Sequence, residues 1–136
     1  EAGLARAKVK PCDFHGKAAY MEIREREQQP AYLCTFSMID NIDAKGVARY
    51  PVGQCPIIDP QTGQVPVDSL GRRSYLTSIA YGPSVGKNIG LGYLPADITE
   101  VGRELTMEYF DESFPIRIEA VGYGALYDPD NAKPKS

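Results

Sequence analysis

From residue 31 onward, glycine and proline divide the sequence into short segments in which apolar and polar residues alternate. Alternation with a period of two is typical of β-strands, because successive side chains of a strand point to opposite faces. Glycine and proline are common in the turns that join strands. A series of about six such segments predicts a mainly β protein, built as a six-stranded antiparallel barrel with Greek-key-like connections.

The expected strands lie at residues 31–38, 53–58, 73–81, 88–95, 104–110 and 114–121. In the first of them, alternation places Cys34, Phe36 and Met38 on one face, together with Tyr32. The last two strands are separated only by residues 111–113, so we expect them to pair as a hairpin.

The middle of the chain carries two further signals. Strict alternation over residues 73–81 places Leu76 and Ile79 on opposite faces of their strand. In the next strand, Gly90 and Gly92 occupy alternate positions, although glycine weakens a strand. We therefore expect a neighbouring backbone or bulky side chain to lie close to these glycines, at a tight curve of the barrel.

One short α-helix is expected before the strands, over residues 17–26, which are mostly good helix formers. Ala19 and Ile23 give it a narrow apolar stripe, and the run from Gln28 to Pro30 ends it after about three turns. Gly16, just before the helix, is expected to permit a close approach of the chain.

Composition excludes several classes of function. The net charge is -3, with 15 basic and 18 acidic residues interspersed, which argues against a nucleic-acid surface. No apolar run approaches the length of a membrane span. The cysteines, Cys12, Cys34 and Cys55, are too far apart for a zinc site, so we expect reduced thiols in a cytoplasmic protein. Residues 1–6 lack a start methionine and a signal peptide, as in a piece of a longer chain.

No self-sufficient active site follows from the residue types. The single histidine, His15, leaves one candidate base for nucleophilic catalysis and sits beside a glycine in a loop. The segment from Gly82 to Lys87 has the wrong spacing for a phosphate loop, and Asn88 stands where a hydroxyl is needed. We therefore assign no catalytic residue and no metal ligand.

Charged residues in the turns are the remaining candidates. The carboxylates of Asp59 and Asp68, or of Asp111 and Glu112, form possible catalytic pairs, but acidic residues are expected in turns for solvation. The Arg72-Arg73 pair is a candidate anion site, and a solvated turn is the favoured interpretation.

Five segments stand out when they are taken in order: residues 13–17, 77–78, 84–95, 102–105 and 114–115. They follow the patterns D-F-x-G-[KR] before a short helix, then T-S, then S-x-G-K-x-[IV]-[AG]-[LM]-[AG]-Y-[VL]-P, then P-G-T-x-[LV], then a hairpin with a proline. In this order they resemble the C-terminal domain of the glycine-cleavage T-protein family, over about residues 10–126. The residues of this structural motif are Asp13, Phe14, Gly16, Gly86, Gly90, Gly92, Tyr93 and Pro95. Val101 departs from the family's proline.

The family includes the aminomethyltransferase of glycine cleavage, folate-dependent demethylases, and the folate-binding halves of sarcosine and dimethylglycine dehydrogenases. The resemblance implies that tetrahydrofolate and the acid-base aspartate lie mainly in preceding domains, and that a barrel like this one covers one side of the folate channel. It implies a linker at residues 1–12, the barrel domain at 13–125 and an irregular tail at 126–136. The partners implied are upstream folate-binding domains of the same polypeptide and a small-molecule substrate.

The resemblance leaves the parent open between an aminomethyl or methyl transferase and a demethylating oxidoreductase with FAD in an upstream domain. The ending at residues 126–131 favours the demethylating branch. The chain alone is expected to hold no cofactor and to catalyse nothing. Lys87 is expected to meet a carboxylate of folate's glutamate or of an adjoining domain, and Tyr127 to line the cleft. The alternative is a stand-alone β-barrel that binds a small molecule or a protein.

Overall fold

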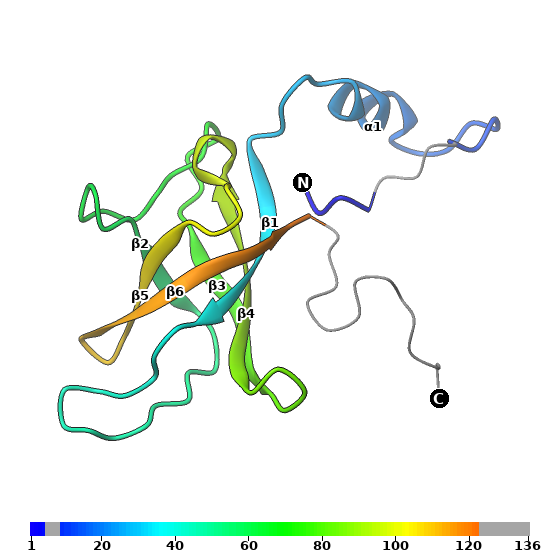
Figure 1. Ribbon diagram of the computed structural model, residues 1–136. Helices are drawn as coiled ribbons and strands as arrows, with labels where there is room; N and C mark the ends of the chain where they lie inside the picture. The colour runs from blue at the N-terminus through cyan, green and yellow to red at the C-terminus, as the bar shows by residue number, and fades with distance from the viewer. Residues whose placement is uncertain (5–8, 123–136) are drawn as a thin grey trace.

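Six antiparallel strands close into a barrel, and one helix stands outside it (Figure 1). The computed structural model describes residues 1–4 and 9–122. Around the barrel the strands follow the order β1, β4, β3, β2, β5, β6. The elements are α1 (Lys17–Arg24), β1 (Ala31–Met38), β2 (Cys55–Ile58), β3 (Tyr75–Gly82), β4 (Lys87–Pro95), the 3-10 helix η1 (Ala96–Ile98), β5 (Glu104–Tyr109) and β6 (Glu112–Val121). The predicted mainly β barrel with one short helix is confirmed.

Side chains from the strands fill the inside of the barrel. In β1 the predicted inward face is confirmed for Cys34, Phe36 and Met38, while Tyr32 is only partly buried. Large side chains with almost no exposed surface complete the core: Ile57, Leu76, Leu94, Leu105, Met107, Phe114, Ile116 and Ile118. The interior is therefore a packed hydrophobic core, which is the main source of stability in a domain of this size.

The face predicted for part of β3 is wrong. Leu76 and Ile79 were expected on opposite faces, but both side chains are buried in the core. The pairing register between β3 and β4 shifts between Leu76 and Ser78. A bulge of this kind inserts one residue into a strand and reverses the alternation that follows it.

The predicted hairpin of β5 and β6 is confirmed, with a tighter turn than the sequence indicated. Tyr109 pairs with Glu112, so only Phe110 and Asp111 form the loop. Their φ angles are 51° and 60°. Two positive φ angles are what a type I′ turn requires, and such turns match the twist of the flanking strands.

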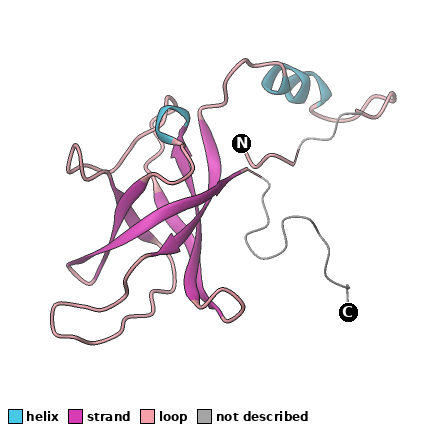
Figure 2. Cartoon of the chain, in the orientation of Figure 1, coloured by secondary structure: helices cyan, strands magenta, loops and turns pink. Residues whose placement is uncertain are grey.

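The helix α1 covers less than expected. It ends at Arg24, none of its residues is buried, and both residues of the predicted stripe, Ala19 and Ile23, are exposed. Figures 1 and 2 show it beside the barrel rather than on it. The expected close approach at Gly16 is also wrong: a Cβ atom there would meet no atom of residues 1–4 and 9–122 within 4 Å, and glycine is favoured because φ is +81°. No helix of residues 1–4 and 9–122 is long and apolar enough to span a bilayer.

The backbone of β3 lies close to Gly92 of β4. A Cβ atom on Gly92 would stand 2.6 Å from the carbonyl oxygen of Tyr75, which is backbone and cannot move aside. A Cβ on Gly90, two residues earlier in β4, would meet mainly the flexible end of Leu76 at 3.1 Å. The predicted close neighbours are therefore present at both glycines, and the contact at Gly92 is the stricter one.

We expect Gly92→Ala to destabilise the barrel by more than about 2 kcal/mol, because the new methyl group would force the two backbones apart. The matched control in the same strand is Gly90→Ala, for which we expect about 1 kcal/mol or less, since a side chain can adjust. Urea unfolding of both variants measures the difference. Equal losses would contradict a backbone contact specific to Gly92.

A buried aspartate organises each of three loops. Asp43, Asp59 and Asp68 are 6%, 7% and 7% exposed, and each forms an ion pair with an arginine. The carboxylate of Asp43 accepts hydrogen bonds from the amides of Val47 and Lys45 and from Nε of Arg49. The amide of Val47 is the largest of several contacts that lower the pKa of Asp43, against an opposing effect of burial.

We expect Asp43 to contribute stability that depends on pH. A carboxyl group whose pKa is lower in the folded chain stabilises the fold above its unfolded pKa of about 3.9, and this contribution is lost as the pH falls through the folded value. The difference in unfolding free energy between the natural chain and Asp43→Asn should be constant above about pH 5 and shrink below pH 4. The control Asp13→Asn, at an exposed position with no ion pair in the described residues, should show no such change. A constant difference down to pH 2 would contradict the assignment.

Candidate functional site

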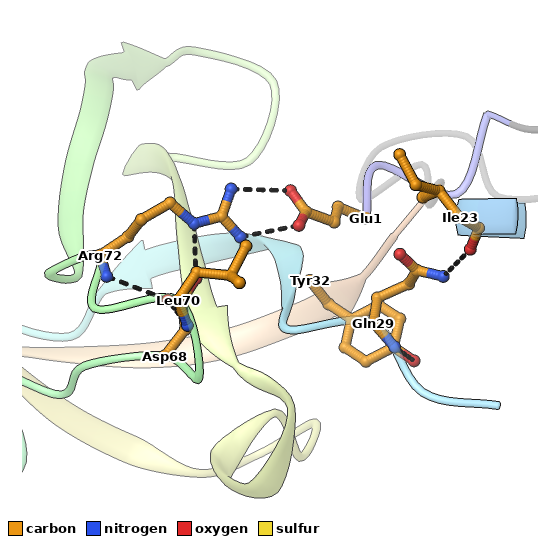
Figure 3. A network of polar contacts seen from close by, with 7 residues as sticks. All are labelled: Glu1, Ile23, Gln29, Tyr32, Asp68, Leu70 and Arg72. Atoms are coloured by element: carbon orange, nitrogen blue, oxygen red, sulfur yellow. Dashed lines mark hydrogen bonds and ion pairs between the residues drawn. The ribbon is translucent and has the colours of Figure 1, made fainter. Parts of the chain in front are cut away.

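The loop of Asp68 carries a polar network that reaches the beginning of the chain (Figure 3). The carboxylate of Asp68 accepts hydrogen bonds from the amides of Leu70 and Arg72, at 2.9 and 3.0 Å. Its second oxygen accepts Nε of Arg72 at 2.6 Å. The two terminal nitrogens of the same guanidinium donate to the carboxylate of Glu1. Arg72 therefore joins its own loop to residues at the beginning of the chain.

Both charges of this loop are held in their ionised forms. Burial of Asp68 opposes ionisation, but the amide and guanidinium of Arg72 and the amide of Leu70 outweigh it, so the pKa of Asp68 is lowered. Hydrogen bonds to Glu1 and then to Asp68 raise the pKa of Arg72. Both shifts favour the ion pair of Asp68 and Arg72.

A cleft of about 570 Å³ lies beside this network, over the outer surface of β3 and β4. Its size falls in the range of small-molecule sites. The side chains of Tyr75 and Tyr93 line it and are 43% and 37% exposed. The remaining lining residues are Glu1, Ala31, Asp68, Arg72, Arg73, Ser74, Thr77, Leu94 and Pro95. The cleft therefore combines apolar walls with two arginines.

The structure separates the residues that the sequence singled out. Tyr93 and Pro95 line the cleft. Lys87 lies at the other end of β4, where it is exposed and lines a hollow of about 170 Å³ with Tyr50, Tyr81 and Asn88. Tyr127 lies outside the described residues. Lys87 and the cleft are thus not one site.

Other motif residues, among them Asp13, Phe14 and Gly86, lie outside the cleft. Asp13 and Phe14 are exposed before α1, where Lys17 donates to the carbonyls of Pro11 and Cys12 and stands 6.0 Å from the ring centre of Phe14. Gly86 has φ +67° in the turn before β4.

The acidic and sulfur groups offer little reactivity. Asp59 is paired with Arg103 at 3.0 Å, so it and Asp68 act as loop anchors rather than as a catalytic pair. Burial raises the pKa of the Cys34 thiol to about 12, which keeps it protonated. Cys55 is also buried, and Cys12 is exposed. Within residues 1–4 and 9–122 there is no group of three or more His, Cys, Asp or Glu that would hold a metal ion.

Sequence reasoning did not find the cleft. Arg72 was considered as an anion site, and Tyr93 as part of a motif, but the contact of Glu1 with Arg72 joins residues 71 positions apart. The available signal was the spacing of Asp68 and Arg72, four residues apart around Gly71, which suits a closed loop.

The chain is similar to known proteins in sequence and in fold. Residues 42–122 match the family described as the glycine cleavage T-protein C-terminal barrel domain. The chain is 26% identical over 109 residues to the mitochondrial dimethylglycine dehydrogenase of Rattus norvegicus, covering 80% of this chain and 11% of that protein. It also resembles the crystal structure of the glycine cleavage system aminomethyltransferase T from Bartonella henselae, with a TM-score of 0.59 and 17% identity, over 79% of this chain and 25% of that one.

The two relatives carry different weight. At 17% identity the solved structure supports the shared fold alone. The chain spans about a tenth of the length of the dehydrogenase and a quarter of that of the aminomethyltransferase. These matches therefore do not assign the activity of either protein to the chain. The family match covers more than half of the chain and includes five of the six strands, β2 to β6. The chain therefore belongs to the family of glycine cleavage T-protein C-terminal barrel domains.

Proposed function

We propose that this chain is the C-terminal accessory domain of a tetrahydrofolate-dependent aminomethyltransferase- or demethylase-like protein. It closes one side of a folate channel that preceding domains of the same polypeptide form. The observation that carries the proposal is the position of the cleft of Tyr75 and Tyr93, which opens on the outer surface of a family barrel whose interior is filled. A ligand in such a cleft is enclosed only when a second surface covers it.

The outer elements support a partner domain. On α1 the side chains of Tyr20 and Ile23 are 38% and 45% exposed, although an isolated helix of eight residues is marginal in water. An apolar stripe on such a helix gains stability when it packs against a neighbouring surface. An upstream domain of the same polypeptide is the partner that the family membership favours.

The similar proteins support two types of parent protein. A demethylating oxidoreductase with an upstream FAD domain agrees with the similarity to dimethylglycine dehydrogenase, and an aminomethyltransferase agrees with the similarity in fold to aminomethyltransferase T. Folate contacts by Lys87 and Tyr127, the domain boundaries at residues 12 and 125, and a cytoplasmic location stay predictions.

The second candidate function is a stand-alone binding barrel. The volume of the cleft, about 570 Å³, favours it, because a cleft of that size suits a small molecule. The packed interior weighs against it, since barrels that enclose a ligand keep a cavity between their strands.

Isothermal titration calorimetry with tetrahydrofolate separates the two candidates. The in-frame coding sequence upstream of residue 1 identifies the parent polypeptide, which we expect to contain folate-channel domains and to bind tetrahydrofolate. The 136-residue chain alone should not bind it measurably, because most of the contacts would be missing.

Variants of the parent locate the contact. We expect Tyr93→Ala to weaken tetrahydrofolate binding about tenfold, since the aromatic wall of the cleft is lost. The control is Phe110→Ala in the turn between β5 and β6, where the side chain is 81% exposed; it should leave the dissociation constant unchanged. Tight binding by the isolated chain, or a parent without folate-channel domains, would contradict the proposal.

A further inference from the structure

The guanidinium of Arg72 is held in a fixed orientation before any ligand arrives. Asp68 accepts its Nε at 2.6 Å, and the carboxylate of Asp68 is itself held by the amides of Leu70 and Arg72. The side chain of Asp68 is only 2% exposed, so this anchor is sheltered from water. A guanidinium fixed along one edge presents its two terminal nitrogens on the other edge with little loss of entropy on binding.

A carboxylate already occupies that edge. The side chain of Glu1 accepts Nη2 at 2.7 Å through one oxygen and Nη1 at 3.3 Å through the other (Figure 3). This two-bond arrangement is the geometry by which arginine recognises carboxylates. The side chain of Glu1 is 28% exposed. Water therefore reaches the pair, and exposed ion pairs contribute little to stability, so Glu1 is readily displaced.

The surroundings fit an acid with two carboxylates. Arg73 lines the same cleft and is exposed. Within residues 1–4 and 9–122 it forms no ion pair. Tyr75 and Tyr93 supply walls for a short run of methylene groups. Asp68 balances one of the two arginine charges, so displacement of Glu1 leaves one positive charge uncompensated. That charge favours an anionic ligand.

We propose that this cleft is a binding site for a short dicarboxylate, and that Glu1 is an internal occupant which the ligand displaces. One carboxylate of the ligand replaces that of Glu1 on Arg72, and the other lies near Arg73. The site is the same cleft that the proposed function assigns to the folate channel, but all of its contacts come from this chain, so glutarate binding can fail while the proposed function holds. It takes a free dicarboxylate or the dicarboxylate end of a larger molecule through the same contacts.

Titration of the purified chain with glutarate tests this proposal, followed by NMR signals of Tyr75, Tyr93 and the Nε–H of Arg72. We expect saturable shifts with a dissociation constant in the millimolar range, and none with glutaramide, which has the same length and no charge. Glu1→Gln should tighten glutarate binding about fivefold, because the competing carboxylate is removed. N-acetylglutamate, the free form of a glutamyl end, should bind like glutarate if larger molecules use the site.

Two arginine variants complete the test. Arg72→Lys keeps the charge but loses the two-bond geometry, and should weaken binding about tenfold. Arg117→Lys, in an exposed pair with Glu104, is the matched control and should change nothing. If Arg72→Lys fails to fold, the comparisons with Glu1→Gln and with glutaramide still test whether the cleft binds a dicarboxylate. Equal shifts with glutaramide, no saturation with glutarate, or unchanged binding in Glu1→Gln would overturn the proposal.

Discussion

The close approach of β3 to β4 at Gly92 is the constraint on which the rest of the structure depends. A six-stranded barrel has to curve sharply to close, and here the carbonyl of Tyr75 occupies the place of a side chain at Gly92. Tyr75, whose carbonyl makes this contact, and Tyr93, the residue after Gly92, point outward by the alternation of their strands and line the cleft. The tight contact between the strands and the candidate site therefore lie next to each other.

The filled interior determines where this barrel can act. Side chains such as Leu76, Met107 and Ile118 leave almost no exposed surface inside, so binding is confined to the outer face and the loops. The buried aspartates of the loops are committed to loop structure, as Asp68 and Asp59 show through their arginine partners, whereas Arg73 lines the cleft and is exposed. The outer face with the cleft of Tyr75 and Tyr93 is therefore the surface available for binding. This agrees with the proposal that the domain completes a site formed by other domains.

The sequence predicted the parts of the fold that local patterns encode. Alternation identified the inward face of β1, and the short separation of the last two strands identified their hairpin. The crowding at Gly92 was also foreseen, because glycine in a strand requires a reason. The bulge after Leu76 was missed, since an inserted residue is invisible to a rule that assumes strict alternation.

The candidate site was largely beyond prediction because it depends on contacts between distant segments. Neither the pairing of Glu1 with Arg72 nor the cleft between them follows from spacing along the chain. Family resemblance correctly identified the barrel and drew attention to Lys87, which the structure places at the opposite end of β4 from the cleft. The motif at residues 84–95 thus predicted the strand β4, whereas the cleft became visible only in the folded structure.

Under the proposed function, preceding domains cover the cleft face and α1. Hydroxyl-radical footprinting measures this directly, by comparing the solvent accessibility of Tyr75, Tyr93 and Tyr20 in the isolated chain and in the parent polypeptide. We expect strong protection of all three tyrosines in the parent. Phe110 in the turn between β5 and β6, which is 81% exposed, should be labelled equally in both. Equal labelling of the three tyrosines in the chain and the parent would contradict the proposed function.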